Sequence, residues 1–296
     1  RWQSHECVAR DAHDTNACTE VGRNVLDIKV GDRVGIGAQV GSCMNCHACK
    51  HDNESYCVGD GYGYMIDTYN CRWPDGSIAQ GGYSTAIRAH KQFVFPIPES
   101  IESKHAAPML CAGLTVFSPL YRHKVGPGSR VGIVGIGGLG HFGIMFARAM
   151  GADAVVAISH TASKRDDALK MGATDFVLMK EEREWAATFQ EMPLDLILIT
   201  AASSTVELTA IVSCLRVEGR LVCLALPKGD MQLPLMELCN RGASISSSHI
   251  GSKVEALRML DLAAEKRIIP WVEVMDMKEC SKAIERLEKG DGAFTM

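Results

Sequence analysis

Four cysteines lie within fifteen residues, in the pattern Cys43-x-x-Cys46-x-x-Cys49-x7-Cys57. Thiolates at such short separations can surround one Zn²⁺ ion tetrahedrally, and four sulfur ligands leave no open position for chemistry. The pattern therefore predicts a structural zinc ion that stabilises a loop with little core of its own. The alternative, four unconnected cysteines, is disfavoured by this spacing.

A zinc module of this kind can also bind nucleic acid, so the charge around it matters. The chain has a net charge of -4, and no run of basic residues lies beside the cysteines. Because nucleic-acid binding needs a basic surface, we expect no nucleic-acid partner.

The bulk properties indicate a globular protein in a reducing compartment. A length of 296 residues with 47% hydrophobic side chains predicts about two domains with proper cores. The sequence contains no apolar run of membrane-spanning length and no signal peptide, so we expect no membrane partner and a cytoplasmic location. Of the twelve cysteines, four are assigned to metal, and Cys214, Cys223 and Cys239 lie in apolar segments where buried cysteines are common.

The chain changes character near Cys111. Before it, Gly, Cys and turn residues surround short strand-like pieces such as Asp32–Ile36 and Phe93–Pro96. After it, apolar strands alternate with helical patterns such as 139–150 and 163–171, which predicts a parallel sheet covered on both faces. The predicted strands of this second part are Arg130–Ile136, Ala154–Ser159, Asp175–Met179, Asp195–Ala201, Arg220–Leu226 and Ser244–Ile250.

A glycine-rich turn joins the first of these strands to a helix. It reads Gly135-Ile136-Gly137-Gly138-Leu139-Gly140, and the strand–turn–helix context is the one that a dinucleotide-binding site requires. Gly135 allows the tight turn, Gly137 lets a pyrophosphate approach the backbone, and Gly140 lets helix and strand pack closely. The helix N-terminus then supplies N–H groups for the anion. A glycine-rich turn without a ligand is the alternative.

The end of the second strand indicates which dinucleotide binds. An NAD site places an acidic residue there, whereas this chain has Ser159 and His160, followed by Lys164 and Arg165. Hydroxyl groups and cations suit the extra 2′-phosphate of NADP(H), so we favour NADP(H). The alternative for the two cations is a solvated helix start, although cations there oppose the helix dipole.

Further segments recur in one known family. They are Gly31-Asp32-Arg33-Val34-Gly35, Gly81-Gly82-Tyr83, Cys111-Ala112-Gly113-Leu114-Thr115-Val116, the segment 163–173 and Glu288-Lys289-Gly290-Asp291. With these motifs the chain resembles the zinc-dependent medium-chain alcohol dehydrogenases. More narrowly, it resembles the cinnamyl alcohol dehydrogenase branch with its fungal NADP-dependent, broad-specificity members.

The resemblance implies an α/β fold: a GroES-like catalytic domain with a structural-zinc lobe, joined to a Rossmann doubly wound parallel sheet. It also implies a catalytic zinc held by an N-terminal Cys, a His in a Gly-His-Glu triplet and a later Cys. Cys111 matches the later Cys, His5 and Glu6 match the triplet, and Thr115 matches the position near the nicotinamide. Taken alone, Cys111 would be a small buried residue at a domain junction and His5 a solvated terminal residue.

The sequence departs from the family near both ends. The first cysteine ligand has no counterpart, a polar segment 7–20 replaces a short apolar strand, and the last family strand is missing after Phe294. Cys7 and Cys18 are alternative third ligands, although their spacing does not require this role. We therefore expect an N- and C-terminally incomplete member of the family.

The expected domains are a catalytic part at 1–111 with the zinc lobe at 43–57, an NADP-binding part at 112–250, and a C-terminal segment 251–296 that returns to the catalytic part. The resemblance implies a homodimer that transfers hydride between NADPH and a cinnamyl-type or aliphatic aldehyde. The alternative is a catalytically impaired fragment that binds zinc and NADPH. The number of zinc ions per chain distinguishes the two, because only the enzyme needs a second one.

Overall fold

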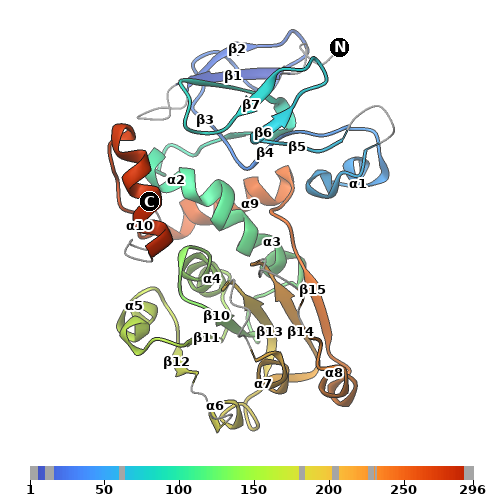
Figure 1. Cartoon of the computed structure of the whole chain (residues 1–296), viewed down its shortest axis with the longest axis vertical. Helices are drawn as coiled ribbons and strands as arrows, with labels where there is room; N and C mark the ends of the chain where they lie inside the picture. The colour runs from blue at the N-terminus through green and yellow to red at the C-terminus, as the bar shows by residue number, and fades with distance from the viewer. Residues whose placement is uncertain are drawn as a thin grey trace. The chain divides into compact units, whose positions relative to one another are not determined.

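The computed structural model describes residues 6–10, 17–59, 64–179, 184–201, 207–225, 230 and 232–289, with the backbone alone for 6–10 and 184. The chain divides into two compact units (Figure 1). Unit 1 comprises Arg1–Leu114 and His249–Phe294, and unit 2 comprises Thr115–Ser248. The division into domains at residues 111 and 250, made from the sequence, stays a prediction. Across the described ranges, every helix is too short or too polar to cross a bilayer.

Unit 2 is built on one six-stranded parallel sheet in the order β12-β11-β10-β13-β14-β15. Its strands are β10 (Arg130–Val134), β11 (Ala154–Ser159), β12 (Asp175–Leu178), β13 (Leu194–Ile199), β14 (Leu215–Cys223) and β15 (Ser244–Ser247). Numbered along the chain, this order is 3-2-1-4-5-6, the doubly wound arrangement of dinucleotide-binding sheets. The order reverses between β10 and β13, which makes the carboxyl ends of these two strands the expected ligand crevice.

Helices cover the sheet of unit 2 on both faces. Besides the connecting helix α3 (Leu114–Arg122), the helices of this unit are α4 (Gly138–Ala149), α5 (Arg165–Lys170), α6 (Glu184–Ala187), α7 (Leu208–Ser213) and α8 (Leu235–Arg241). Successive residues of β10 point to opposite faces, as a strand requires. Val134 belongs to the core that includes α6 and α7, whereas Ile133 lies against Gly143 of α4. The β10 strand is therefore buried on both sides, which explains its continuous apolar sequence.

Unit 1 is made of small antiparallel sheets. They contain β1 (Glu6–Arg10), β2 (Ala17–Val21) and β8 (Ala86–His90); β3 (Val34–Ile36) and β9 (Val94–Pro96); β4 (Gln39–Gly41) and β5 (Ile66–Asp67); and β6 (Tyr69–Arg72) and β7 (Ile78–Gln80). A core that includes Cys18, Val40 and Trp73 connects them. Gly and turn residues interrupt these strands and keep them short. Pairing between short strands gives little stability by itself, so the shape of this unit also depends on other interactions.

The helical segments of unit 1 come from both ends of its sequence. They are α1 (His47–Lys50), η2 (Glu54–Tyr56), η3 (Lys91–Phe93), α2 (Ser103–Pro108), the π-helical turn η4 (Met109–Gly113), α9 (Lys253–Lys266), η6 (Met277–Glu279) and α10 (Cys280–Lys289). The helix α3 (Leu114–Arg122) leads into unit 2. Ser252 and Glu255 form a capping box that fixes where α9 begins.

Several strand bounds and the burial of one cysteine differ from the sequence prediction. The strands β10, β13 and β15 end at Val134, Ile199 and Ser247, two or three residues before the predicted ends. The strand β14 begins at Leu215, five residues before the predicted start, because its first part pairs with Leu194 before a register shift around Glu218. Cys239 is exposed on α8, and the prediction that it is buried was wrong. The reason is that α8 buries none of its residues, and Glu237, Asn240 and Arg241 lie among its apolar side chains. Cys214 is buried and Cys223 is half-buried, in line with the prediction.

Candidate functional site

The four sulfur atoms of the cysteine lobe, residues 43–57, converge on one point. All four Sγ atoms lie within 4.8 Å of one another, and Cys46 Sγ is 3.5 Å from Cys49 Sγ and 4.0 Å from Cys57 Sγ. A tetrahedral Zn²⁺ with Zn–S bonds near 2.3 Å separates its sulfur ligands by about 3.8 Å. The donor set and its spacing therefore fit a closed four-thiolate zinc site.

Backbone N–H groups surround these sulfurs. Cys43 Sγ accepts from the N–H of Cys46 at 3.2 Å, and Cys57 Sγ accepts from the N–H of Cys43 and of Gly59, both at 3.4 Å. A hydrogen bond from the backbone of Cys49 lowers the pKa of Cys46 to about 6, whereas burial raises the pKa of Cys49 and Cys57. Such N–H donors stabilise thiolates, the form that binds metal.

A buried carboxylate, Glu54, attaches the cysteine lobe to the rest of unit 1. It is 1% exposed, and its Oε1 accepts from the backbone N–H of Lys253 at 2.7 Å and from Gln92 Nε2 at 3.0 Å. Nearby, His249 Nδ1 donates to the carbonyl oxygen of Ser55 at 3.1 Å. Lys253 is the first residue of α9, so a negative charge there is favoured by the helix dipole. Glu54 could not be recognised from the sequence, because its partners lie far away along the chain.

The glycine-rich turn has the close packing that a dinucleotide site needs. Gly135 has φ +92°, and a Cβ on Gly140 would lie 1.9 Å from the carbonyl oxygen of Gly135. Thr200, at the end of β13, donates through Oγ1 to that same oxygen at 2.7 Å. No described atom lies within 4 Å of the place where Gly137 would carry a Cβ. The turn therefore leaves open space at the N-terminus of α4, which fits an approaching pyrophosphate.

One turn into α4, His141 is fully buried. Its Nδ1 donates to the carbonyl oxygen of Gly138 at 2.7 Å, and burial lowers its pKa to about 4. The imidazole is therefore neutral at pH 7.

The end of β11 carries the residues predicted to select the cofactor. Ser159 is buried, and its Oγ accepts from the backbone N–H of Thr161 at 3.1 Å, which shapes the turn. His160 and Arg165 are exposed and Lys164 is half-buried. The guanidinium of Arg165 lies over the ring of Phe176, 5.1 Å from its centroid. A stacked guanidinium keeps its edge N–H groups available for a phosphate.

Cys111 lies in the π-helical turn η4, between α2 and α3. Its side chain is exposed to solvent, yet surrounding protein still raises the pKa of its thiol. The phenol of Tyr69 also has a raised pKa, first through burial and then through the negative charge of Cys111. Turns of π-helix are rare and occur frequently at functional sites, a signal that the sequence did not reveal. Thr115 follows in the first turn of α3 and is half-buried.

The other predicted metal ligands are described only in part. His5 lies outside the described residues, and Glu6 begins β1 with its backbone opposite His90. Of the two alternative ligands, Cys18 is 1% exposed within the core of unit 1, and the side chain of Cys7 is not described. Within the described ranges, the cysteine lobe is the one group of at least three metal-binding side chains.

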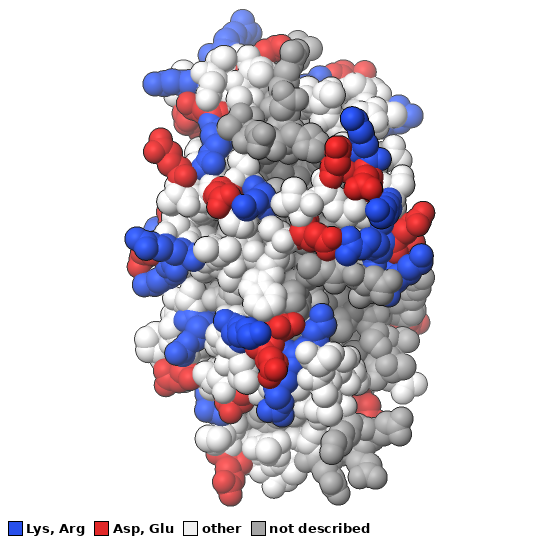
Figure 2. Space-filling view, turned by 90° about the vertical axis from the view of Figure 1, so that its left-hand side faces the viewer, with Lys and Arg blue, Asp and Glu red and all other residues white. Residues whose placement is uncertain are grey.

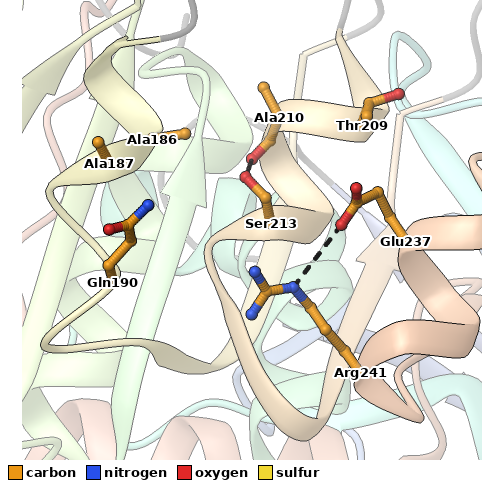
Figure 3. A pocket seen from close by; sticks show the side chains of 8 residues that line it. All are labelled: Ala186, Ala187, Gln190, Thr209, Ala210, Ser213, Glu237 and Arg241. Carbon is orange, nitrogen blue, oxygen red and sulfur yellow. Dashed lines mark hydrogen bonds and ion pairs between the residues drawn. The ribbon is translucent and has the colours of Figure 1, made fainter.

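A separate hollow of about 200 Å³ lies in unit 2 (Figure 3). It is lined by Ala186, Ala187, Gln190, Thr209, Ala210, Ser213, Glu237 and Arg241, none of which was predicted as a site residue. Ser213 Oγ donates to the carbonyl oxygen of Ala210 at 2.7 Å, and Arg241 Nη1 donates to that of Leu215 at 2.8 Å. These polar groups bond within the protein, so we assign no ligand to this hollow.

Two family models match this chain. The model of the alcohol dehydrogenase GroES-like domain matches residues 16–99, and that of the zinc-binding dehydrogenases matches residues 138–265. The chain belongs to the zinc-dependent medium-chain alcohol dehydrogenase family. This confirms the resemblance and the fold class inferred from the sequence.

Relatives and solved structures agree with this membership. The chain is 44% identical to the NADP-dependent alcohol dehydrogenase 6 of Saccharomyces cerevisiae, over 89% of this chain and 72% of that protein. A cinnamyl alcohol dehydrogenase structure from Sorghum bicolor matches with a TM-score of 0.89 and 30% identity, over 99% of this chain and 89% of that one. A structure of the Helicobacter pylori enzyme complexed with NADP(H) matches with a TM-score of 0.83 and 27% identity, over the same shares.

The Cys46→Ser variant should lose zinc and stability together. A serine hydroxyl is a poor zinc ligand, and metal binding stabilises such sites by about 10–16 kcal/mol in small peptides. We expect the zinc content to fall by about one ion per chain and the melting temperature and folded yield to drop. Metal analysis and thermal unfolding measure both. Cys71→Ser, a half-buried cysteine outside the lobe, is the matched control. Unchanged zinc content and melting temperature in Cys46→Ser would show that the lobe is not a zinc site.

Proposed function

We propose that this chain is an NADP(H)-dependent alcohol dehydrogenase that reversibly reduces an aldehyde to a primary alcohol. The observation that carries the proposal is the end of β11, where Ser159 and His160 stand in place of an acidic residue and Lys164 and Arg165 follow. The position lies beside the glycine-rich turn, since β11 pairs with β10. The family and the NADP-dependent relatives support the same cofactor.

The chain's own residues would bind and orient the cofactor. Open space at Gly137 and the N–H groups that begin α4 would hold the pyrophosphate, and Ser159, Lys164 and Arg165 would hold the 2′-phosphate. When bound, NADPH supplies the hydride. Thr115, predicted near the nicotinamide, would help to position the ring.

Two metal sites are part of the proposal. The cysteine lobe would hold the structural zinc, because four thiolates close its coordination sphere. Cys111, with His5 and Glu6, would hold a catalytic zinc. When bound, that metal supplies electrostatic stabilisation of the negative charge that develops on the carbonyl oxygen. The exposure of Cys111 suits a ligand whose metal must remain open to substrate.

We further propose a small-molecule substrate and a reducing, cytoplasmic location. On the face shown in Figure 2, basic and acidic side chains are interspersed, without an extended basic patch of the kind that binds nucleic acid. None of the described cysteines forms a disulfide bond, which fits a compartment that keeps thiols reduced.

The Lys164→Ala variant should bind NADPH more weakly and NADH almost unchanged. A charge-assisted hydrogen bond to phosphate contributes about 1.5–3 kcal/mol, so we expect NADPH affinity to fall about tenfold to a hundredfold. Titration calorimetry with both cofactors measures this. Lys170→Ala, which removes an exposed lysine at the other end of α5, should leave both affinities unchanged. Equal losses of NADPH and NADH affinity in Lys164→Ala would place Lys164 away from the 2′-phosphate.

The zinc-loaded chain should oxidise NADPH in the presence of cinnamaldehyde or an aliphatic aldehyde. Cys111→Ser should lower turnover by about a hundredfold or more and leave NADPH binding intact, because it removes a metal ligand and not a cofactor contact. NADPH absorbance measures turnover, and Cys280→Ser, a half-buried cysteine on α10, is the control. NADPH binding with one zinc ion per chain and no turnover would support the alternative, an impaired zinc- and NADPH-binding protein.

We propose that the chain forms a homodimer through the β15 edge of its sheet. Among the described strands β15 pairs with β14 alone, and the free edge of such a strand can pair with a second copy. The helix α8, which leads directly into β15, exposes Leu235 and Met236 by 66% and 73%.

Sedimentation velocity should therefore give twice the chain mass of 32.1 kDa. Leu235→Glu should shift the protein toward monomer, because it buries a charge in the proposed interface. Val274→Glu, at a residue of unit 1 that is 71% exposed, should leave the dimer intact. A monomer at micromolar concentration of the unsubstituted chain would contradict the proposal.

A further inference from the structure

Two histidines of the cysteine lobe have no role in the function proposed above. His47 is the first residue of α1, and His51 directly follows its last residue. The two are four positions apart, so their side chains lie about one helical turn from each other. Both are exposed, and their rings stack with centroids 4.1 Å apart and planes inclined by 24°. Two exposed imidazoles at this spacing can reach one metal ion.

The hydrogen bond of His51 fixes which of its nitrogens is available. His51 Nδ1 lies 2.7 Å from the carbonyl oxygen of His47. A carbonyl oxygen can only accept, so Nδ1 carries the proton, and in the neutral ring the free lone pair is on Nε2. Metal-binding histidines commonly donate their other N–H to a backbone carbonyl in this way, which fixes the tautomer and orients the ring.

The cysteine lobe also supplies a favourable electrostatic setting. Four thiolates around one Zn²⁺ carry a net charge of -2, and His47 directly follows the ligand Cys46, while His51 lies two residues after Cys49. A second cation beside this cluster is attracted to it, and imidazole nitrogen is a ligand that suits Zn²⁺, Cu²⁺ and Ni²⁺.

We propose that His47 and His51 form a second metal site, a two-imidazole chelate for a divalent transition-metal ion on the surface of the cysteine lobe. Stacked rings do not point their nitrogens at a common ion, so binding requires the exposed His47 side chain to rotate about its χ angles until one ring nitrogen meets the ion held by His51 Nε2. Water completes the coordination sphere. This site is separate from the four thiolates and from Cys111, and it does not depend on the proposed enzymatic activity.

Calorimetric titration of the zinc-loaded full chain with Ni²⁺ tests the site. We expect His47→Ala and His51→Ala each to weaken one Ni²⁺ binding event by at least about tenfold, because either change destroys the chelate. The double variant should be little weaker than either single variant. His123→Ala, which removes a half-buried histidine of unit 2, should leave this binding unchanged. Metal analysis before and after titration verifies that the thiolate-bound zinc is retained.

Three results would overturn the proposal. One is unchanged Ni²⁺ affinity in the double variant. Another is two independent events, of which each single variant removes one. In the third, the alanine variants lose the zinc of the lobe but keep their Ni²⁺ affinity. The histidines would then stabilise the charge of the zinc-bound thiolates instead of binding a second metal. If the alanine variants fold poorly, His47→Gln and His51→Gln keep the size and polarity and should give the same loss.

Discussion

The cysteine lobe takes its shape from the convergence of four sulfur atoms. Between residues 43 and 57 the buried residues are Glu54 and Ser55, and both are polar. A segment without apolar side chains in its interior gains little from the hydrophobic effect, so another interaction has to offset its loss of conformational entropy. Sulfur–metal bonds are strong enough to do this, and the spacing of the Sγ atoms fits them.

The same constraint extends beyond the lobe through Glu54. Its carboxylate accepts from the first backbone N–H of α9, 199 residues away in the chain. Two residues separate Glu54 from Cys57, so a lobe whose sulfurs are held by a metal also holds the N-terminus of α9 in place. Burial of a carboxylate is unfavourable unless hydrogen bonds compensate it; Lys253 and Gln92 both donate to Oε1, whereas the buried Oε2 has no hydrogen-bond partner among the described residues. A change at this carboxylate should therefore affect both the lobe and the helix.

The sequence predicts a structural feature best where the interactions that determine it are local. In the turn at 135–140, the positive φ of Gly135 and the close approach of Gly140 to the carbonyl oxygen of Gly135 agree with the backbone roles predicted for them, because both arise within six residues of chain. The alternation of strands and helices likewise predicted the parallel sheet. The cysteine spacing predicted convergence of the four sulfurs, because it is a spacing typical of ligands that share one zinc ion.

Long-range interactions could not be predicted in this way. The partners of Glu54 come from segments near residues 92 and 253, and Thr200 closes the glycine-rich turn from another strand. No spacing rule relates such positions. Cys239 shows the converse error: cysteine is usually buried, but on α8 it is exposed while its neighbour Leu238 packs against the core, and exposure depends on tertiary packing rather than on residue type.

The exposure of Cys111 follows from the helix turn that contains it. In the turn η4, Met109, Leu110 and Gly113 are buried while Cys111 is exposed. A π-helical turn inserts one residue relative to α-helical spacing, and this changes which side chains face the core. Cys18 and Cys214, on regular strands and helix ends, instead direct their sulfurs into apolar cores. The same residue type is thus an inert core element in one place and an accessible sulfur in another. Because a catalytic zinc keeps one coordination position open, the accessible sulfur at Cys111 is the one of these three that fits such a metal.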